Sequence, residues 1–254
     1  MAEKNRGPHG GRRARRAAAQ AAARAHGHRG RGRPAVKRRA AHAVVAGGAP
    51  ARTPTGRGEV RIIGGQWKRT RLPVAQQPGL RPTPDRVRET LFNWLGQDLT
   101  GWRCLDAFAG TGALGLEAAS RGASVELVES DPALVAQLRA VLQRLQVPPT
   151  QQVAVQRGDG IAALRQSAPA SLQLIFLDPP FASDLFSPAL QAARRAVAPG
   201  GFIYLEAPQP WDAAALAPLG FAAQRTLRAG AVHAHLLRPV VPAQDALLSI
   251  AASA

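Results

Sequence analysis

A glycine-rich segment between an apolar stretch and a helical stretch is the first feature that could carry chemistry. Residues 105–115 read Leu-Asp-Ala-Phe-Ala-Gly-Thr-Gly-Ala-Leu-Gly, so Gly110, Gly112 and Gly115 satisfy the pattern G-x-G-x-x-G. Such a loop lets the backbone approach a ligand at the start of a helix and is typical of dinucleotide-binding folds. The pattern alone is a weak signal, because a tight strand-to-helix turn without a ligand can contain the same glycines.

Acidic residues near this loop indicate the kind of ligand. Glu129 closes the next apolar stretch, where its carboxylate could accept hydrogen bonds from both hydroxyls of a ribose. Asp106 stands beside the loop, where it would repel a pyrophosphate but pair with a cation. Asp159 could accept a hydrogen bond from an adenine amino group, and it could also cap the helix that follows. S-adenosylmethionine, with its adenosine ribose and cationic amino-acid part, is a ligand that fits these groups.

A second motif, Asp178-Pro-Pro-Phe, follows the apolar segment 172–177. Two consecutive prolines remove two backbone donors and stiffen the turn, so the Asp178 carboxylate and the Pro179 carbonyl can face outward as paired acceptors. Paired acceptors suit an exocyclic amino group, and Phe181 offers a ring on which a flipped-out base can stack. The alternative is a strand-ending turn with a core phenylalanine. The two motifs together favour a site that methylates an amino group.

Apolar strands alternate with helical segments from Trp102 onward. We expect strands at 103–106, 124–129, 152–156, 172–178 and 202–206, helices near 112–121, 131–146, 159–166 and 184–197, and an antiparallel pair at 221–227 and 231–237. Such repeats predict an α/β, Rossmann-like fold with a mostly parallel sheet, whose ligands lie beyond the carboxyl ends of the strands. Both motifs are therefore expected at one edge of the sheet.

Residues 59–96 are expected to form a small hairpin and a helix in front of this sheet. Two short strands surround Gly64-Gly65, and Thr83 or Asp85 with Pro84 supplies a helix start signal. This segment is rich in cations, which we expect to contact nucleic-acid phosphates. The alternative is an ordinary solvated charged face. The residues in question are Arg61, Lys68, Arg69, Arg71, Arg86 and Arg88.

Charge is distributed unevenly along the 254 residues, whose formal net charge is +17. Residues 1–58 contain 15 basic residues and one acid, whereas the remainder has a net charge of only +3. This excludes a uniformly basic, histone-like chain. We expect residues 1–58 to form a disordered basic arm with weak affinity for nucleic acid, although nucleotide composition could explain the arginine bias. Residues 59–240 would form the folded domain, with a core at 101–240, and 241–254 a frayed tail.

Other features of the sequence indicate the cellular location and exclude some kinds of site. No apolar run is long enough to span a membrane, and the N-terminus has no apolar signal region, so a cytoplasmic protein is expected. The single cysteine, Cys104, excludes an intramolecular disulfide and a zinc cluster built on cysteines. The predicted chemistry needs no metal.

Four segments together resemble the RsmD family of 16S ribosomal RNA guanine-N2 methyltransferases. They begin Val60-Arg-Ile-Ile-Gly-Gly-Gln-Trp-Lys, Gly79-Leu-Arg-Pro-Thr-Pro-Asp-Arg-Val-Arg, Leu105-Asp-Ala-Phe-Ala-Gly-Thr-Gly and Asp178-Pro-Pro-Phe. The resemblance extends over roughly residues 60–240, and its first two segments are more specific than the glycine loop.

The resemblance implies a class I S-adenosylmethionine-dependent methyltransferase acting on a guanine of the small ribosomal subunit or an assembly intermediate. We expect the protein to be a monomer. Arg81, Pro82, Thr83 and Arg86 would lie in the segment covering the cofactor pocket. Site roles carry over motif by motif. The cofactor would be held by Asp106, Phe108, Gly110, Gly112, Glu129 and Asp159, with Thr83 reaching it, and the target base by Asp178, Pro179 and Phe181.

Three other functions stay open at the level of the sequence. An adenine-N6 methyltransferase could use the same Asp-Pro-Pro-aromatic turn, and only residues 60–96 argue against it. An NAD-dependent oxidoreductase could use the glycine loop, but Asp106 and the Asp178 motif count against it. A ribosome-assembly factor that binds RNA without catalysis is the third, although all the expected site residues are present.

Overall fold

The computed structural model describes residues 58–74 and 83–240. The predicted basic arm, apart from Gly58, and the predicted tail at 241–254 lie outside the described residues, as do Arg81 and Pro82. Within the described ranges, no helix has the length and apolar character needed to cross a membrane.

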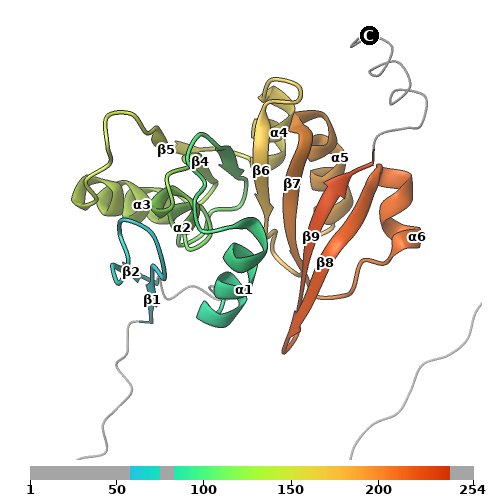
Figure 1. The fold of residues 1–254 in the computed structure, drawn as a ribbon, viewed down its shortest axis with the longest axis horizontal. Helices are drawn as coiled ribbons and strands as arrows, with labels where there is room; N and C mark the ends of the chain where they lie inside the picture. The colour runs from blue at the N-terminus through green and yellow to red at the C-terminus, as the bar shows by residue number, and fades with distance from the viewer. Residues whose placement is uncertain (1–57, 75–82, 241–254) are drawn as a thin grey trace, which may run out of the picture. The chain divides into compact units, whose positions relative to one another are not determined.

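A seven-stranded sheet in the order β5-β4-β3-β6-β7-β9-β8 forms the centre of the fold (Figure 1). Its strands are β3 Arg103–Asp106, β4 Ser124–Glu129, β5 Val153–Arg157, β6 Leu172–Leu177, β7 Val197–Ala207, β8 Phe221–Ala229 and β9 Val232–Pro239. β5, β4, β3, β6 and β7 pair in parallel, and β9 is antiparallel to both of its neighbours. The predicted parallel sheet with an antiparallel C-terminal pair is confirmed.

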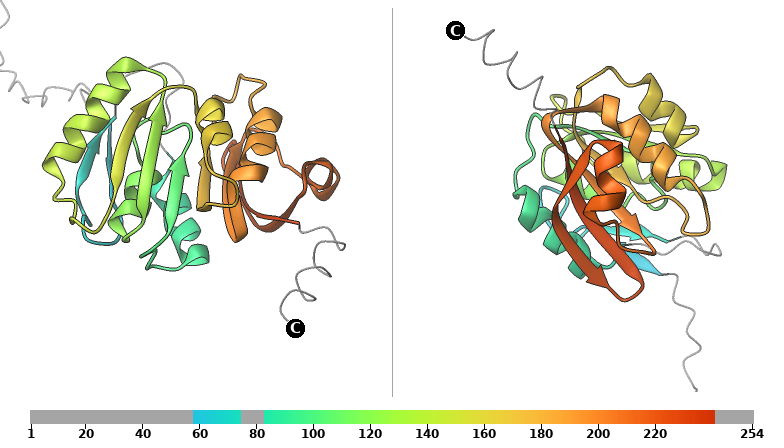
Figure 2. Two further views of the ribbon diagram at one scale, coloured as in Figure 1. Left: turned by 90° about the horizontal axis from the view of Figure 1, so that it is seen from above. Right: turned by 90° about the vertical axis from the view of Figure 1, so that its right-hand side faces the viewer.

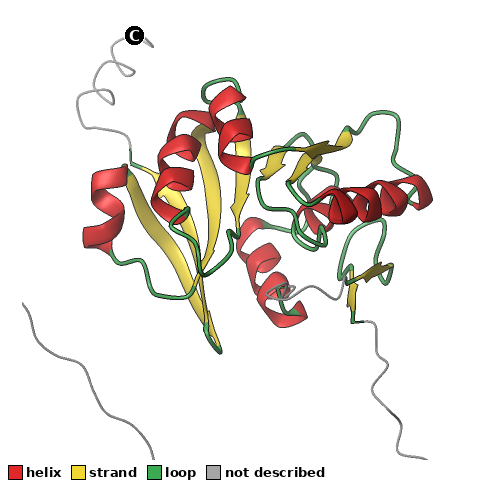
Figure 3. Cartoon of the chain, turned by 180° about the vertical axis from the view of Figure 1, so that it is seen from behind, coloured by secondary structure: helices red, strands yellow, loops and turns green. Residues whose placement is uncertain are grey.

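Helices cover both faces of this sheet (Figure 2). They are α1 Asp85–Leu95, α2 Gly115–Ser120, α3 Pro132–Arg144, α4 Gly160–Gln166, α5 Phe186–Ala196 and the short α6 Ala213–Leu216, which a 3-10 turn follows. Side chains alternate along β6, so Leu174 and Phe176 pack in one core with α1, α2 and α3. Ile175 and Leu177 pack in the other core with α4, α5 and α6, which lie in front in Figure 3.

A hairpin of β1 Glu59–Arg61 and β2 Arg71–Pro73 precedes α1, as predicted. It packs directly on the end of α2. Gly65 has a φ of +73°, and a Cβ added there would lie 1.8 Å from the Ser120 carbonyl oxygen, so only glycine allows this approach. Gln66 N–H donates to that carbonyl at 2.7 Å, and Trp67 N–H donates to the Ser120 hydroxyl at 2.9 Å. The hairpin is therefore part of the domain.

Candidate active site

The glycine loop connects β3 to α2 at the carboxyl edge of the sheet, where the sequence places it. Gly112 has a φ of +79°, a conformation that favours glycine. Gly110 N–H donates to Glu129 Oε2 at 2.8 Å, which ties the loop to the end of the neighbouring β4. Phe108 is partly buried against the core beside α4 and α5. The loop and Glu129 thus form one connected surface.

Asp106, at the end of β3, lies beneath this surface, and its carboxylate is fully buried. Its Oδ2 accepts a hydrogen bond from Gly115 N–H at 2.9 Å, whereas its Oδ1 is buried without a hydrogen-bond partner among the described residues. Burial, reinforced by the charge of Glu129 and opposed by the Gly115 bond, raises the pKa of Asp106 to about 7. A buried acceptor of this kind is satisfied when a cation or donor binds beside it.

Glu129 and Asp159 are held by backbone groups. Glu129 Oε1 accepts from Asp131 N–H at 2.8 Å, which leaves each carboxylate oxygen with further capacity to accept a ribose hydroxyl. Asp159 is exposed and caps α4, because its Oδ1 accepts from Ala162 N–H at 2.7 Å. The helix-cap role of Asp159 is confirmed, and its cofactor role stays a prediction.

The Asp178-Pro-Pro-Phe turn leaves β6 at the same edge as the glycine loop. β3 and β6 pair in parallel, with Asp106 opposite Phe176. Pro179 is buried, while Phe181 is 39% exposed and is one of two large apolar side chains exposed in the described residues. Burial, followed by the charges of Glu206 and Asp106, raises the pKa of Asp178 well above its usual range. The turn presents a ring next to an unusually basic carboxylate.

Glu206, which we did not predict from the sequence, adds a third carboxyl group to this edge. It follows Leu205 on β7, and Leu205 pairs with Leu177, so Glu206 lies next to Asp178. Glu206 is buried, its Oε1 accepts from the Tyr204 hydroxyl at 2.8 Å, and it hydrogen-bonds with the Thr83 side chain. A glutamate that closes the strand Phe-Ile-Tyr-Leu-Glu was the available sequence signal.

Thr83 therefore lies beside the carboxyl groups of the site, buried in front of α1. The helix start predicted from Thr83 or Asp85 with Pro84 is confirmed, because α1 begins at Asp85. The helix begins after Pro84 without a side-chain cap hydrogen bond, because Thr83 is engaged by Glu206 and Asp85 by arginines.

A protein-family model described as "Conserved hypothetical protein 95" matches residues 60–238, which include the hairpin, α1 and almost the whole sheet. The chain belongs to this family, the RsmD family.

Curated relatives in the RsmD family include the "Ribosomal RNA small subunit methyltransferase D" of Escherichia coli K12, which is 48% identical over 128 residues. That alignment covers 50% of this chain and 63% of the relative, less than two thirds of its length. The protein of the same name from Haemophilus influenzae is 42% identical over 158 residues, which are 61% of this chain and 81% of the relative.

Solved structures agree with this assignment. The "Putative methyltransferase yhhF" from Escherichia coli has a TM-score of 0.61 at 38% identity, covering 73% of this chain and 100% of that one. The putative methylase HI0767 from Haemophilus influenzae has a TM-score of 0.60 at 34% identity and covers 72% and 100%. The class I methyltransferase fold expected from the sequence is thus confirmed.

The hairpin of this RsmD-family chain carries most of the predicted RNA contacts on its surface. Arg61 and Arg71 have side chains that are 65% and 69% exposed. They pair with Asp85 at 3.6 Å and with Glu59 at 2.8 Å, respectively. Lys68, Arg69 and Arg86 are exposed as well. An open pocket of about 200 Å³ lies between the hairpin and α1, and its lining includes Arg61, Lys68, Arg69, Asp85 and Glu89.

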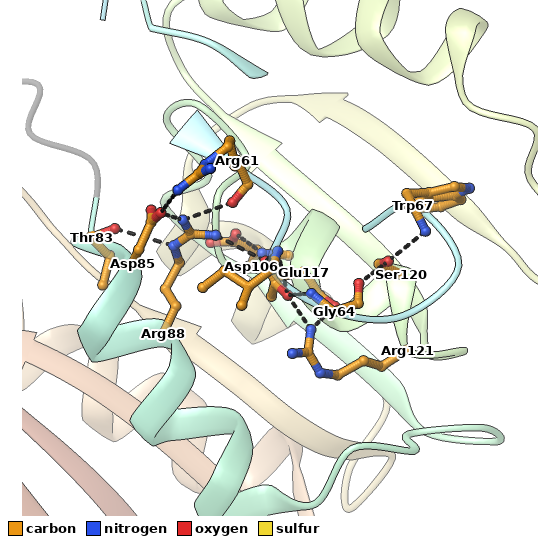
Figure 4. Close-up of polar contacts among 12 residues, drawn as sticks. Arg61, Gly64, Trp67, Thr83, Asp85, Arg88, Asp106, Glu117, Ser120 and Arg121 are labelled. Atoms are coloured by element: carbon orange, nitrogen blue, oxygen red, sulfur yellow. Dashed lines mark hydrogen bonds and ion pairs between the residues drawn. The ribbon is translucent and has the colours of Figure 1, made fainter. Parts of the chain in front are cut away.

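Arg88 corrects the prediction of a surface contact, because its side chain is fully buried in this member of the family (Figure 4). Its Nη1 donates to Glu117 Oε2 at 2.9 Å, and its Nη2 donates to Asp85 Oδ1 at 2.6 Å. Nη2 also donates to the Arg61 carbonyl, and Nε to the Thr83 carbonyl. Arg88 therefore joins α1 to the hairpin and α2 and has no surface on which a phosphate could bind.

Proposed function

We propose that this RsmD-family protein transfers a methyl group from S-adenosylmethionine to the exocyclic N2 of a guanine in 16S ribosomal RNA of the small subunit. The observation that carries the proposal is the adjacency of β3 and β6, which brings the glycine loop and the Asp178-Pro-Pro-Phe turn to one edge. A donor site beside a base-stacking turn is what methylation of a base requires. The relatives named for small-subunit ribosomal RNA support the substrate class.

S-adenosylmethionine fits the residues present. The orphaned Oδ1 of Asp106 suits a cationic ammonium group, and the Glu129 oxygens suit ribose hydroxyls. Gly110 and Gly112 provide the close backbone approach, while Phe108 and Asp159 would border the adenine. When bound, the cofactor supplies a methyl group already activated by its sulfonium charge, so the protein chiefly aligns the acceptor nitrogen and excludes water.

The target base is assigned to the turn after β6. Phe181 stacks on the flipped guanine, and the Asp178 carboxylate and Pro179 carbonyl accept hydrogen bonds from its amino group. These bonds orient the nitrogen lone pair, and the carboxylate stabilises the positive charge that develops on nitrogen. The exposed cations of the hairpin and α1 hold the flanking phosphates.

The identity of the methylated nucleoside tests this function. Radiolabelled S-adenosylmethionine is incubated with the full-length protein and small-subunit particles, or deproteinised 16S RNA, that lack native methylation. We expect the label in N2-methylguanosine. Label in N6-methyladenosine would keep the site but overturn the guanine substrate, and no label despite cofactor binding would favour a non-catalytic assembly factor.

Cofactor affinity should depend on pH through Asp106. Because the pKa of Asp106 is raised to about 7, the free protein holds a proton there at acidic pH and must lose it to pair with an ammonium. Binding of S-adenosylhomocysteine should therefore weaken by about tenfold for each pH unit below 7 and level off above it. Calorimetry at pH 6 in two buffers of different ionisation enthalpy should show a released proton. Asp106→Asn should remove this release, and an unchanged release would contradict the assignment.

Affinity for RNA should depend on the exposed hairpin cations. Replacing Lys68 and Arg69 with glutamine should weaken RNA binding and reduce the slope of log affinity against log salt by about 1.4, as two lost phosphate contacts predict. Affinity for S-adenosylhomocysteine should not change. Arg225 and Arg228, which are exposed on edge strand β8, provide a control with the same loss of charge. An equal effect of both double variants would show that only net charge matters.

A further inference from the structure

Glu206 is a buried charge that the proposed mechanism does not use. We infer that Glu206 is a positioning residue whose carboxylate keeps Asp178 basic enough to take the proton released by the target amino group. The catalytic part of this inference rests on the proposed function. Its effect on Asp178 is a property of the cofactor-free protein and can be measured separately.

Strand register brings the two carboxyl groups together. Leu177, the last residue of β6, pairs with Leu205 of β7, so Asp178 leaves the sheet beside Glu206, which is still within β7. Phe176 and Tyr204, two residues earlier, belong to the core on the α1 side. Because side chains alternate along a strand, Glu206 faces the same side as Tyr204, and it contacts Thr83 in front of α1. Asp178, directly after β6, lies next to it, with Glu206 buried and Asp178 partly buried.

Hydrogen bonding divides the roles between these acids. The Tyr204 hydroxyl donates to Glu206, the Thr83 side chain hydrogen-bonds with it, and the Arg88 charge favours its ionised form. Burial still raises the pKa of Glu206, but these contacts oppose it, whereas no described group opposes the rise at Asp178. Glu206 is therefore the acid that stays charged, and the proton of the pair resides on Asp178.

Among the described residues, the charged or titratable groups that act on this pair lie on four elements. The groups comprise Asp106 at the end of β3, Tyr204 on β7, Arg88 on α1 and, through Asp106, Glu129 at the end of β4. Asp106 acts on Asp178 in the same direction as Glu206, but less strongly. Glu206 is thus the larger of the two charges that make Asp178 basic.

Proton transfer accompanies methyl transfer at the target nitrogen. The lone pair of the target nitrogen forms the new N–C bond, the C–S bond breaks, and its electron pair stays on sulfur. One N–H proton passes to a carboxylate oxygen of Asp178, giving a neutral methylamino group, a thioether and a carboxylic acid. A more basic carboxylate takes this proton more readily, and positioned acid–base groups contribute about 10²–10⁴-fold to rates.

Glu206→Gln tests the inference because it removes the charge and keeps the shape. Cofactor-free protein labelled with carbon-13 at the aspartate carboxyls is titrated by NMR, and the Asp178 signal is the one missing from Asp178→Asn. We expect the Asp178 midpoint to fall by about one pH unit or more. Glu126→Gln, the same change on β4 of the same sheet, should leave it in place. An Asp178 midpoint that does not move in Glu206→Gln would overturn the inference.

The pH profile of methyl transfer supplies the catalytic readout. In Glu206→Gln the acidic limb of the rate should move to lower pH with the Asp178 midpoint, and the plateau rate should fall about tenfold. A structural defect would lower the rate without moving the limb, so an unmoved limb would overturn the proton role. Label in a different nucleoside would defeat the proposed substrate but leave the shifted titration as support for the inference.

Tyr204→Phe keeps the test available if Glu206→Gln does not fold. It retains the buried ring and removes the hydroxyl that donates to Glu206. The Glu206 charge then becomes less favourable, so the Asp178 midpoint should fall in the same direction by a smaller amount. A rise of the midpoint would contradict the inference.

Discussion

Asp178→Asn is expected to lower methyl transfer by about 10²–10⁴-fold while cofactor affinity stays close to that of the wild type. Asparagine keeps the acceptor carbonyl but cannot take a proton or stabilise positive charge on the target nitrogen. Single-turnover rates check this result. They are measured with the methyl acceptor that the labelling assay identifies. Asp184→Asn, on the exposed segment that follows the same turn, should retain the wild-type rate.

The same substitution should make the protein more stable at neutral pH. The folded state raises the pKa of Asp178, so the folded protein holds this proton more tightly than the unfolded chain does. The stability from this group is present below its unfolded pKa near 3.8 and is lost as pH rises through the folded pKa. Asparagine mimics the protonated form, so the gain in free energy of unfolding should vanish at low pH. If Asp178→Asn lowers activity but its free energy of unfolding at pH 7 is unchanged or reduced, the result would contradict a raised pKa of Asp178 in the folded state.

The sheet and its two motifs could be predicted because they depend on local patterns. Apolar strands such as 172–177 are followed by the predicted site residues. Because these strands pair in parallel, their carboxyl ends, and with them the site residues, lie at one edge of the sheet. From the sequence, β7 is predicted to begin at Phe202. It begins at Val197, and a register shift opposite β6 accommodates the extra residues.

The buried charges could not be predicted from composition, because their burial depends on partners distant in sequence. Arg88 lies three and four residues before Leu91 and Phe92, so it shares the buried face of α1 with them. This helical spacing is the sequence signal for its burial. A buried arginine is improbable from the sequence alone, since its cost is offset by partners on several elements. These are Asp85, Glu117 of α2 and the carbonyls of Arg61 and Thr83. Glu206 likewise depends on Tyr204 and on the order of strands in the sheet.

Glu117→Gln should lower the free energy of unfolding by about 3–5 kcal/mol, because it removes a charge between two buried guanidinium groups. Among the described residues it leaves Arg121 without a counter-charge and Arg88 with Asp85 alone. Glu117 is fully buried on α2, pairs with Arg88 at 2.9 Å and also pairs with Arg121. Its oxygens accept from Ile63 N–H at 2.8 Å and Gly64 N–H at 2.8 Å, which fixes the hairpin to the domain (Figure 4). Urea denaturation of the two proteins measures the difference.

Glu59→Gln provides the matched control, because it breaks an ion pair of 2.8 Å with Arg71 in which both side chains are largely exposed. Its cost should stay below about 1 kcal/mol.

Replacing Glu117, Arg88 and Arg121 together by methionine separates the two roles of this buried cluster, which are charge pairing and binding of the hairpin amides. Removal of all three charges should restore much of the lost stability. The Ile63 and Gly64 amides would still lack their acceptor, so their hydrogen exchange should stay fast and RNA affinity low. Slow exchange at both amides in the triple variant would show that the hairpin docks without Glu117.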